Sequence, residues 1–214
     1  MRTRRTSSSA MVVAAAALLL SGCAGQGAGT SDQIAGAGPE KAVAPSASAP
    51  SDLIERPAIE LPRDMRNTFE DRETGSTVKD AVLADSARRI GTIDQAISSG
   101  DVKRSGMAFY SADEALGAAY RYARAFLDRG DTWTGTVRYF DRKVTYLKGR
   151  TATLTYCVDE SEAFAKDRGS GKVARNAASA RSFVAYETDL ERTGEGVWRT
   201  TSVKAERGAA ACRP

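Results

Sequence analysis

The segment SADEALGAAYRYARAFLDRGDTWTGTVRYF, residues 111–140, decides the fold class because its hydrophobic period changes at Gly130. Before Gly130 the apolar residues recur three and four positions apart, as they do on one face of a helix. Ser111 to Glu114 has the form of a capping box, which marks a helix start. After Gly130 apolar and polar residues alternate from Thr132 to Phe140, which is typical of a strand. The segment therefore predicts a helix followed by a strand.

The same two patterns place the other elements. A helix is expected over 77–98, with Thr77 and Asp80 at its start and Gly100 after its end. Further strands are expected over 143–147, 151–158, 182–191 and 197–205, with a polar connection over 159–176. Helices come first and an antiparallel meander follows, so the predicted fold class is α+β.

Composition removes several functional classes. The chain has 214 residues, a formal net charge of +4 and no histidine, which excludes Ser-His-Asp and Cys-His catalysis. No dense basic run with interleaved aromatic residues is present, so a nucleic-acid partner is not expected. Gly169-Ser170-Gly171-Lys172 lacks the spacing and the following Ser or Thr of a phosphate-binding loop, and no cofactor is expected. Asp159, Glu160 and Glu162 lack calcium-loop spacing and are interpreted as a turn rather than a metal site.

The N-terminus has the layout of an export signal. A basic start with Arg4 and Arg5 precedes an apolar stretch from Ala10 to Leu20, which ends in Leu20-Ser21-Gly22-Cys23. The last four residues resemble a bacterial lipobox. That resemblance implies cleavage after Gly22 and lipid on the sulfur of Cys23, hence attachment to the extracytoplasmic face of the cell membrane. The predicted organisation is a signal peptide over 1–22, a disordered Gly/Ala/Ser/Pro tether over 23–61 and a folded domain over 62–214.

Other interpretations of the N-terminus stay open at this point. The apolar stretch is about half the roughly 20 residues that a transmembrane helix needs. Ala35-Gly36-Ala37 fits an ordinary secretory cleavage site, although it lies well past the apolar stretch. Arg4-Arg5 is the pair that the Tat route uses, but Thr6-Ser7-Ser8 does not continue the Tat pattern.

Two cysteines remain if Cys23 carries lipid. Cys157 and Cys212 are then expected to form a disulfide, because disulfides persist outside the cytoplasm. The alternative is a reactive or metal-binding thiol, for which the chain offers neither CxxC spacing nor histidine.

The C-terminal half resembles a known family of exported proteins. The residues that carry the likeness are Trp133-Thr134-Gly135, Tyr156-Cys157-Val158-Asp159-Glu160-Ser161, Tyr186 with Leu190, Gly196-Val197-Trp198, Gly208 and Cys212. They are similar to actinobacterial secreted lipoproteins with an NTF2-like (cystatin-like α+β) domain. The resemblance implies N-terminal helices packed on a strongly curved antiparallel sheet that forms a cone. Enzymes on this fold, such as ketosteroid isomerase, use acidic residues and tyrosines inside the cone, but no catalytic position can be aligned here.

Aromatic residues are the candidates for lining such a cone. Trp133, Tyr146, Tyr156 and Tyr186 are expected near a pocket, together with Tyr139, and the alternative is that they fill the core. Trp198 is expected to be packing. Three functions remain open: a non-catalytic binding or interaction module on the membrane, with an envelope protein or a small apolar ligand as partner; a small-molecule binder or carboxylate-dependent enzyme that uses the cone; and a structural spacer.

Overall fold

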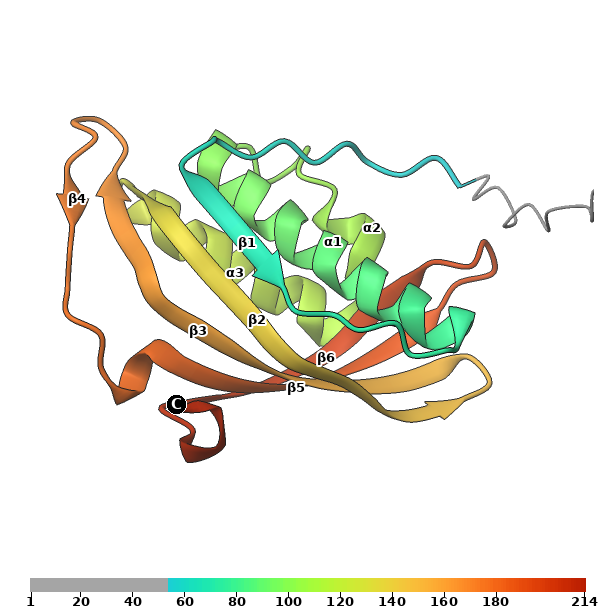
Figure 1. Cartoon of the computed structure of the whole chain (residues 1–214). Helices are drawn as coiled ribbons and strands as arrows, with labels where there is room; N and C mark the ends of the chain where they lie inside the picture. The colour runs from blue at the N-terminus through green and yellow to red at the C-terminus, as the bar shows by residue number, and fades with distance from the viewer. Residues whose placement is uncertain (1–53) are drawn as a thin grey trace, which may run out of the picture. The chain divides into compact units, whose positions relative to one another are not determined.

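A curved sheet wraps around two long helices in residues 54–214, the part of the chain that the computed structural model describes (Figure 1). The predicted signal peptide, Cys23 and most of the predicted tether lie outside the described residues. The elements in chain order are β1 (Met65–Phe69), α1 (Thr77–Ser99), α2 (Met107–Tyr110), α3 (Asp113–Asp128), β2 (Asp131–Lys148), β3 (Thr151–Asp167), β4 (Val173–Ala174), the 3₁₀ turn η1 (Ala180–Ser182), β5 (Phe183–Arg192), β6 (Trp198–Arg207) and the 3₁₀ turn η2 (Ala210–Cys212).

The sheet has the strand order β1-β2-β3-β5-β6, and β4 pairs with β3 at one end. Neighbouring strands are antiparallel except β1, which pairs with β2 in parallel over Met65–Phe69. The α+β class with helices on a curved sheet is confirmed, and β1 makes the sheet mixed rather than purely antiparallel. β1 was not predicted because a five-residue edge strand with one fully buried side chain, Met65, carries almost no alternation.

Helix α1 closely matches its predicted bounds because local signals set both ends. The expected start signal at Thr77 is one residue too late: the N-cap is Ser76, whose side chain accepts a hydrogen bond from the Lys79 amide. Gly100 ends the helix with a left-handed φ of 79°, and its amide bonds to Ala96. The face that meets the sheet carries the predicted apolar stripe, with Val82 and Ile97 fully buried.

Helix α3 also forms, but its predicted capping box is wrong. The N-cap is Ala112, and no side chain caps the helix. Ser111 lies one residue earlier and is fully buried, and its hydroxyl accepts a hydrogen bond from Nε of Arg89 at 2.9 Å. The Ser111 oxygen that would have capped the helix is therefore hydrogen-bonded to the buried Arg89 instead. The short helix α2, immediately before Ser111, was not predicted.

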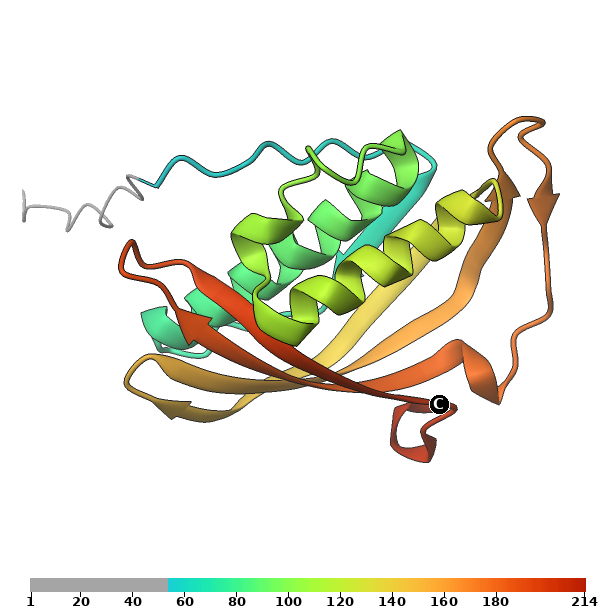
Figure 2. The same cartoon turned by 180° about the vertical axis from the view of Figure 1, so that it is seen from behind.

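The central strands are longer than predicted. β2 is continuous where two strands were expected, with register shifts that include one between Phe140 and Lys143. β3 runs on to Asp167, so the predicted polar connection over 159–176 is wrong in its first half. The polar residues there belong to a strand with one solvent-exposed face. Few side chains in this stretch are apolar, so the sequence shows no clear alternation that would predict a strand. The prolonged β3 follows β2 back to its start, where Asp167 pairs with Asp131 just after the end of α3 (Figure 2).

The hydrophobic core lies between the helices and the concave face of the sheet. Ala152, Leu154, Tyr156 and Val158, which alternate along β3, point into it. Trp198 is 1% exposed and packs in the same core. Cys157 lies on the other face of the sheet in a small cluster with Ala209 and Cys212.

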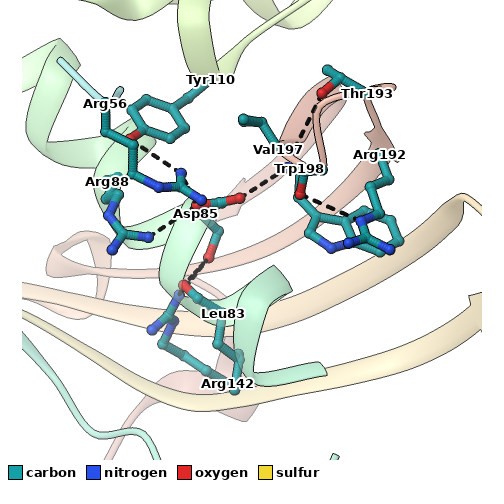
Figure 3. A network of polar contacts seen from close by, with 12 residues as sticks. Arg56, Leu83, Asp85, Arg88, Tyr110, Arg142, Arg192, Thr193, Val197 and Trp198 are labelled. Carbon is teal, nitrogen blue, oxygen red and sulfur yellow. Dashed lines mark hydrogen bonds and ion pairs between the residues drawn. The ribbon is translucent and has the colours of Figure 1, made fainter. Parts of the chain in front are cut away.

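The chain already packs on the domain from the start of the described residues, before the predicted boundary at 62. Arg56 donates to Asp85 of α1 at 2.7 Å and to the hydroxyl of Tyr110 at 3.4 Å (Figure 3). A Cβ on Gly91 of α1 would lie 3.0 Å from Cγ2 of Ile59, so the glycine lets this segment approach closely. Residues 54–61 are therefore part of the folded unit.

Asp85 joins that segment to the rest of the fold. It is 1% exposed, and its Oδ1 also accepts from Arg88 at 3.0 Å. Its Oδ2 accepts from the backbone amide of Trp198 at 2.9 Å, which ties α1 to the start of β6 (Figure 3). The carboxylate of Asp85 is therefore fully hydrogen-bonded, and removing it would leave the buried amide of Trp198 without its acceptor.

Candidate functional site

Two neighbouring cavities open between the helices and the concave face of the sheet. The larger has a volume of about 590 Å³ and the smaller about 280 Å³. Both are lined by Asp94, Tyr122, Tyr139 and Glu160. The larger also has Trp133, Val137, Phe164, Arg129, Arg181 and Arg207 among its walls, and the smaller has Arg89, Ile90, Ile93, Tyr156, Val158 and Tyr186. Volumes of this size suit small molecules.

Asp94 is an acidic residue on the core face of α1 that both cavities share. It is 6% exposed. Its Oδ1 accepts a hydrogen bond from Nε1 of Trp133 at 3.1 Å, and its Oδ2 accepts from Nδ2 of Asn67 at 2.6 Å. Burial raises the pKa of Asp94 to about 6, and the two hydrogen bonds oppose that rise. The carboxyl can therefore take up or release a proton close to neutral pH.

Asn67 and Trp133 hold the Asp94 carboxyl from two different strands. Asn67 lies on β1 and Trp133 on β2, so both flanking donors come from the edge of the sheet. The other amide atom, Oδ1 of Asn67, is buried without a partner among the described residues. If the Asn67 amide rotates, this oxygen can accept a hydrogen bond from residue 94. The donor would be the O–H of a protonated carboxyl or the N–H of an amide at that position.

Arg89 is the second charged residue of the site. It lies on α1, is 7% exposed and forms part of the wall of the smaller cavity. Its Nε donates to Oγ of Ser111 at 2.9 Å, and its Nη2 lies 3.5 Å from the carbonyl oxygen of Ala115. Burial lowers the pKa of Arg89. An arginine in this setting stays charged, because even a lowered guanidinium pKa leaves it protonated at neutral pH.

Three tyrosines form a ladder across the sheet beside these groups. Tyr139, Tyr156 and Tyr186 come from β2, β3 and β5, with ring centroids 6.3 Å and 5.1 Å apart along the series. Burial raises the pKa of all three hydroxyls, so they stay protonated at neutral pH. Within residues 54–214 none of these hydroxyls is hydrogen-bonded to another side chain or to the backbone. They are hydrogen-bond donors available to a bound molecule.

Of the aromatic residues proposed from the sequence, all but one line a cavity. Trp133 lines the larger cavity, and Tyr156 and Tyr186 line the smaller. Tyr146 lies apart from them: it is 49% exposed and lines none of these cavities. Tyr146 was proposed only because it is aromatic, and a register shift between Val144 and Tyr146 interrupts the alternation of β2 at this point.

The sequence analysis did not predict the two charged residues of the site, Arg89 and Asp94. A signal existed: Arg89 and Asp94 interrupt the apolar stripe formed by Ile90, Ile93 and Ile97 in the predicted helix. Charged side chains on the core face of an amphipathic helix are rarely buried, and those that are often belong to functional sites. The partners that complete the site come from β1 and β2, which the pattern along α1 does not reveal.

Asp159, Glu160 and Glu162 lie inside strand β3, so their interpretation as a turn is wrong. Asp159 accepts from Arg138 at 3.3 Å and from the Ser161 amide at 2.9 Å, while Glu160 pairs with Arg207 at 2.5 Å and 3.2 Å. Across residues 54–214, no three His, Cys, Asp or Glu side chains gather as a metal site would require.

Cys157 and Cys212 form a disulfide on the convex side of the sheet. Their Cα atoms lie 5.4 Å apart, and the bond closes a separation of 55 residues. It fixes the C-terminal turn to β3, on the opposite face from the cavities (Figure 1). Among the helices described, none has the length and apolarity to span a membrane.

Comparison with known proteins yields fold likeness only. No family model matches the chain, and no curated protein matches it. Among solved structures it is similar to Aln2 from a Streptomyces species, at 19% identity over 61% of this chain and 90% of that one, with a TM-score of 0.41. It is also similar to the intermembrane space region of the chloroplast protein ARC6, at 12% identity over 60% and 97%, with a TM-score of 0.39. A third is a protein provisionally described as a ketosteroid isomerase from Shewanella frigidimarina, at 12% identity over 61% and 98%, with a TM-score of 0.33.

Proposed function

We propose that this protein is a lipid-anchored cell-envelope protein whose α+β domain binds a small, largely apolar molecule inside the cone. The observation that carries the binding function is a carboxyl, Asp94, buried at the boundary of two cavities. Burying this carboxyl lowers the free energy of unfolding, whereas an apolar side chain at the same position would not. Destabilising buried charges of this kind are typical of functional sites.

The walls define what the cone would accept. Ile90, Ile93 and Val158 provide apolar surface in the smaller cavity, and the tyrosine ladder adds flat aromatic surface with free hydroxyl donors. An apolar or aromatic body with one or two polar groups fits this lining. The domain would then act without chemistry, as a carrier or sensor held at the membrane.

Filling the smaller cavity tests the binding function. Ala118 lies on its wall, so Ala118→Trp should place an indole in the space, whereas Ala210→Trp adds the same side chain at an exposed position of η2. The probes are two uncharged amides, 2-naphthamide and octanamide, titrated by calorimetry into the mature chain with Cys23→Ala. Saturable one-site binding that is lost in Ala118→Trp and kept in Ala210→Trp is expected. Binding that Ala118→Trp leaves intact would contradict the proposal.

The anchor rests on the sequence of the export signal alone. Two or more acyl chains make membrane attachment effectively permanent. Cys23→Ala should release the protein from membranes and abolish labelling with a palmitate analogue. If the variant still fractionates with membranes and labels, the assignment of Cys23 as the anchor is wrong.

A second candidate function is carboxylate-dependent catalysis in the same cavity. It is favoured by the pKa of about 6 at Asp94, which suits a general base near neutral pH, and by the tyrosine donors beside it. Deuterium exchange next to the carbonyl of 2-tetralone, followed by NMR, tests it. Catalysed exchange that Asp94→Asn abolishes would support an enzyme; no catalysed exchange would remove this candidate for carbonyl substrates of that type.

A further inference from the structure

Arg89 is a buried cation that pairs directly with no carboxylate of residues 54–214. Its nearest partners are neutral, the hydroxyl of Ser111 and the carbonyl of Ala115. Within residues 54–214 no carboxylate lies at ion-pair distance from it, and its Nη1 donates no hydrogen bond. An unpaired buried charge costs several kcal/mol in general, which native folds avoid unless the charge is used. Arg89 lies on the wall of the smaller cavity, so an anion that enters there would pair with it.

The acids near Arg89 are already engaged. Glu160, which also lines the smaller cavity, is held by Arg207 through both carboxylate oxygens. Asp94 is held by Asn67 and Trp133, and burial and these hydrogen bonds set its pKa. Tyr156 is close enough to Arg89 to interact electrostatically, but its hydroxyl stays protonated and supplies no charge. A direct ion pair with Arg89 therefore requires an anion from outside the described fold.

The geometry restricts the anion to a small monoanion on an apolar body. A guanidinium presents its donors in a planar fork that matches a carboxylate. One arginine supplies one positive charge, whereas a phosphate monoester would bring nearly two negative charges into a cavity that also holds Asp94. The remaining wall is apolar or aromatic, from residues such as Ile90, Ile93 and Val158.

We propose that the ligand of the cone is an organic carboxylate, with its carboxylate group on Arg89 and its apolar body along the tyrosine ladder. The inference rests on the proposed binding function and adds the chemical class of the ligand. The end of the ligand nearest Asp94 would be uncharged or would carry a hydrogen-bond donor, because a second anion there would meet the acid.

Matched acid and amide probes test this assignment. The mature chain with Cys23→Ala, purified in oxidised form without detergent, is titrated by calorimetry with 2-naphthoate against 2-naphthamide and with octanoate against octanamide. Each pair shares its body and differs in charge. For the wild-type domain sequence, at least one acid should bind tenfold or more tightly than its amide.

Three variants separate recognition from folding. Arg89→Met removes the charge and keeps the length, so the acid should lose its advantage while the amide keeps its affinity. Arg89→Lys keeps the charge without the fork and should retain part of the advantage. Arg124→Met removes an exposed arginine of α3, which pairs with Asp128 at the surface, and should change neither probe.

The outcomes distinguish the carboxylate assignment from the binding function itself. Equal binding of acid and amide to the wild-type domain sequence would overturn the carboxylate assignment and leave the binding function standing. Absence of saturable binding by all four probes would count against both. This comparison needs no variant, so it decides even if Arg89→Met fails to fold. Unfolding temperatures add a second test: if Arg89 only supports the fold through Ser111, Arg89→Met should lower the midpoint, whereas relief of an unpaired charge should leave it equal or higher.

Discussion

Replacing Asp94 with asparagine should stabilise the domain at neutral pH. The folded carboxyl has a pKa of about 6 against an ordinary value of 3.8, so between these values the folded state binds a proton that the unfolded state has released. Stability therefore falls as pH rises from about 4 to about 6, and the penalty is complete above that range. A difference of about two pKa units corresponds to about 3 kcal/mol.

The asparagine keeps the local hydrogen bonds. Its Oδ1 can still accept from the Trp133 indole, and its Nδ2 can donate to the unpartnered Oδ1 of Asn67 once that amide rotates. The gain in the free energy of unfolding for Asp94→Asn should thus approach 3 kcal/mol at pH 7.5 and vanish near pH 4.

Urea unfolding at a series of pH values between 4 and 8 measures this difference. Asp128→Asn is the matched control, because Asp128 is exposed at the end of α3 and its replacement should give a small, flat difference. An Asp94→Asn variant that is less stable than the wild type at pH 7.5, or whose difference does not change with pH, would refute the assignment of a raised pKa.

Three further perturbations test the supports of the fold. Cys157→Ser opens a loop of 55 residues to Cys212, worth about 4 kcal/mol, so thermal unfolding should shift down by roughly 10 °C; an unchanged midpoint in calorimetry would show that the bond does not form. Asp85→Ala removes the acceptor shared by Arg56, Arg88 and the buried amide of Trp198, and should cost about 3 kcal/mol or more in chemical unfolding; a loss under 1 kcal/mol would show that the network is not coupled to the fold. Gly91→Leu should displace Ile59 and the segment around it, seen as faster amide exchange in residues 54–61; unchanged protection there would contradict the close contact.

The parts of the fold that follow from local chemistry could be predicted from the sequence. Helix α1 was expected over 77–98 and runs over Thr77–Ser99, because the stop at Gly100 is a local feature. The strand expected over 151–158 lies within β3, and its alternating Leu154 and Tyr156 are buried, for the same reason. In each case the deciding neighbours lie within a few residues along the chain.

The parts that depend on distant partners could not be predicted. Ser111 looks like a helix cap in the sequence but serves Arg89, which lies 22 residues earlier on another helix. Asp94 becomes a candidate site only because Trp133, 39 residues away, donates to it. Such pairings are set when the sheet closes over the helices, and the period of a single segment does not encode them.

Entry of a small molecule into the cone can be followed by the two tryptophan indole signals in an NMR titration. The indole N–H of Trp133 bonds to Asp94, which lines both cavities, whereas that of Trp198 lies in the packed core and serves as an internal control. On titration with 2-naphthoate, the Trp133 signal should move to a saturating limit while the Trp198 signal stays in place. A probe that binds but leaves both signals unmoved, or that shifts both in parallel without saturation, would contradict entry into the cone.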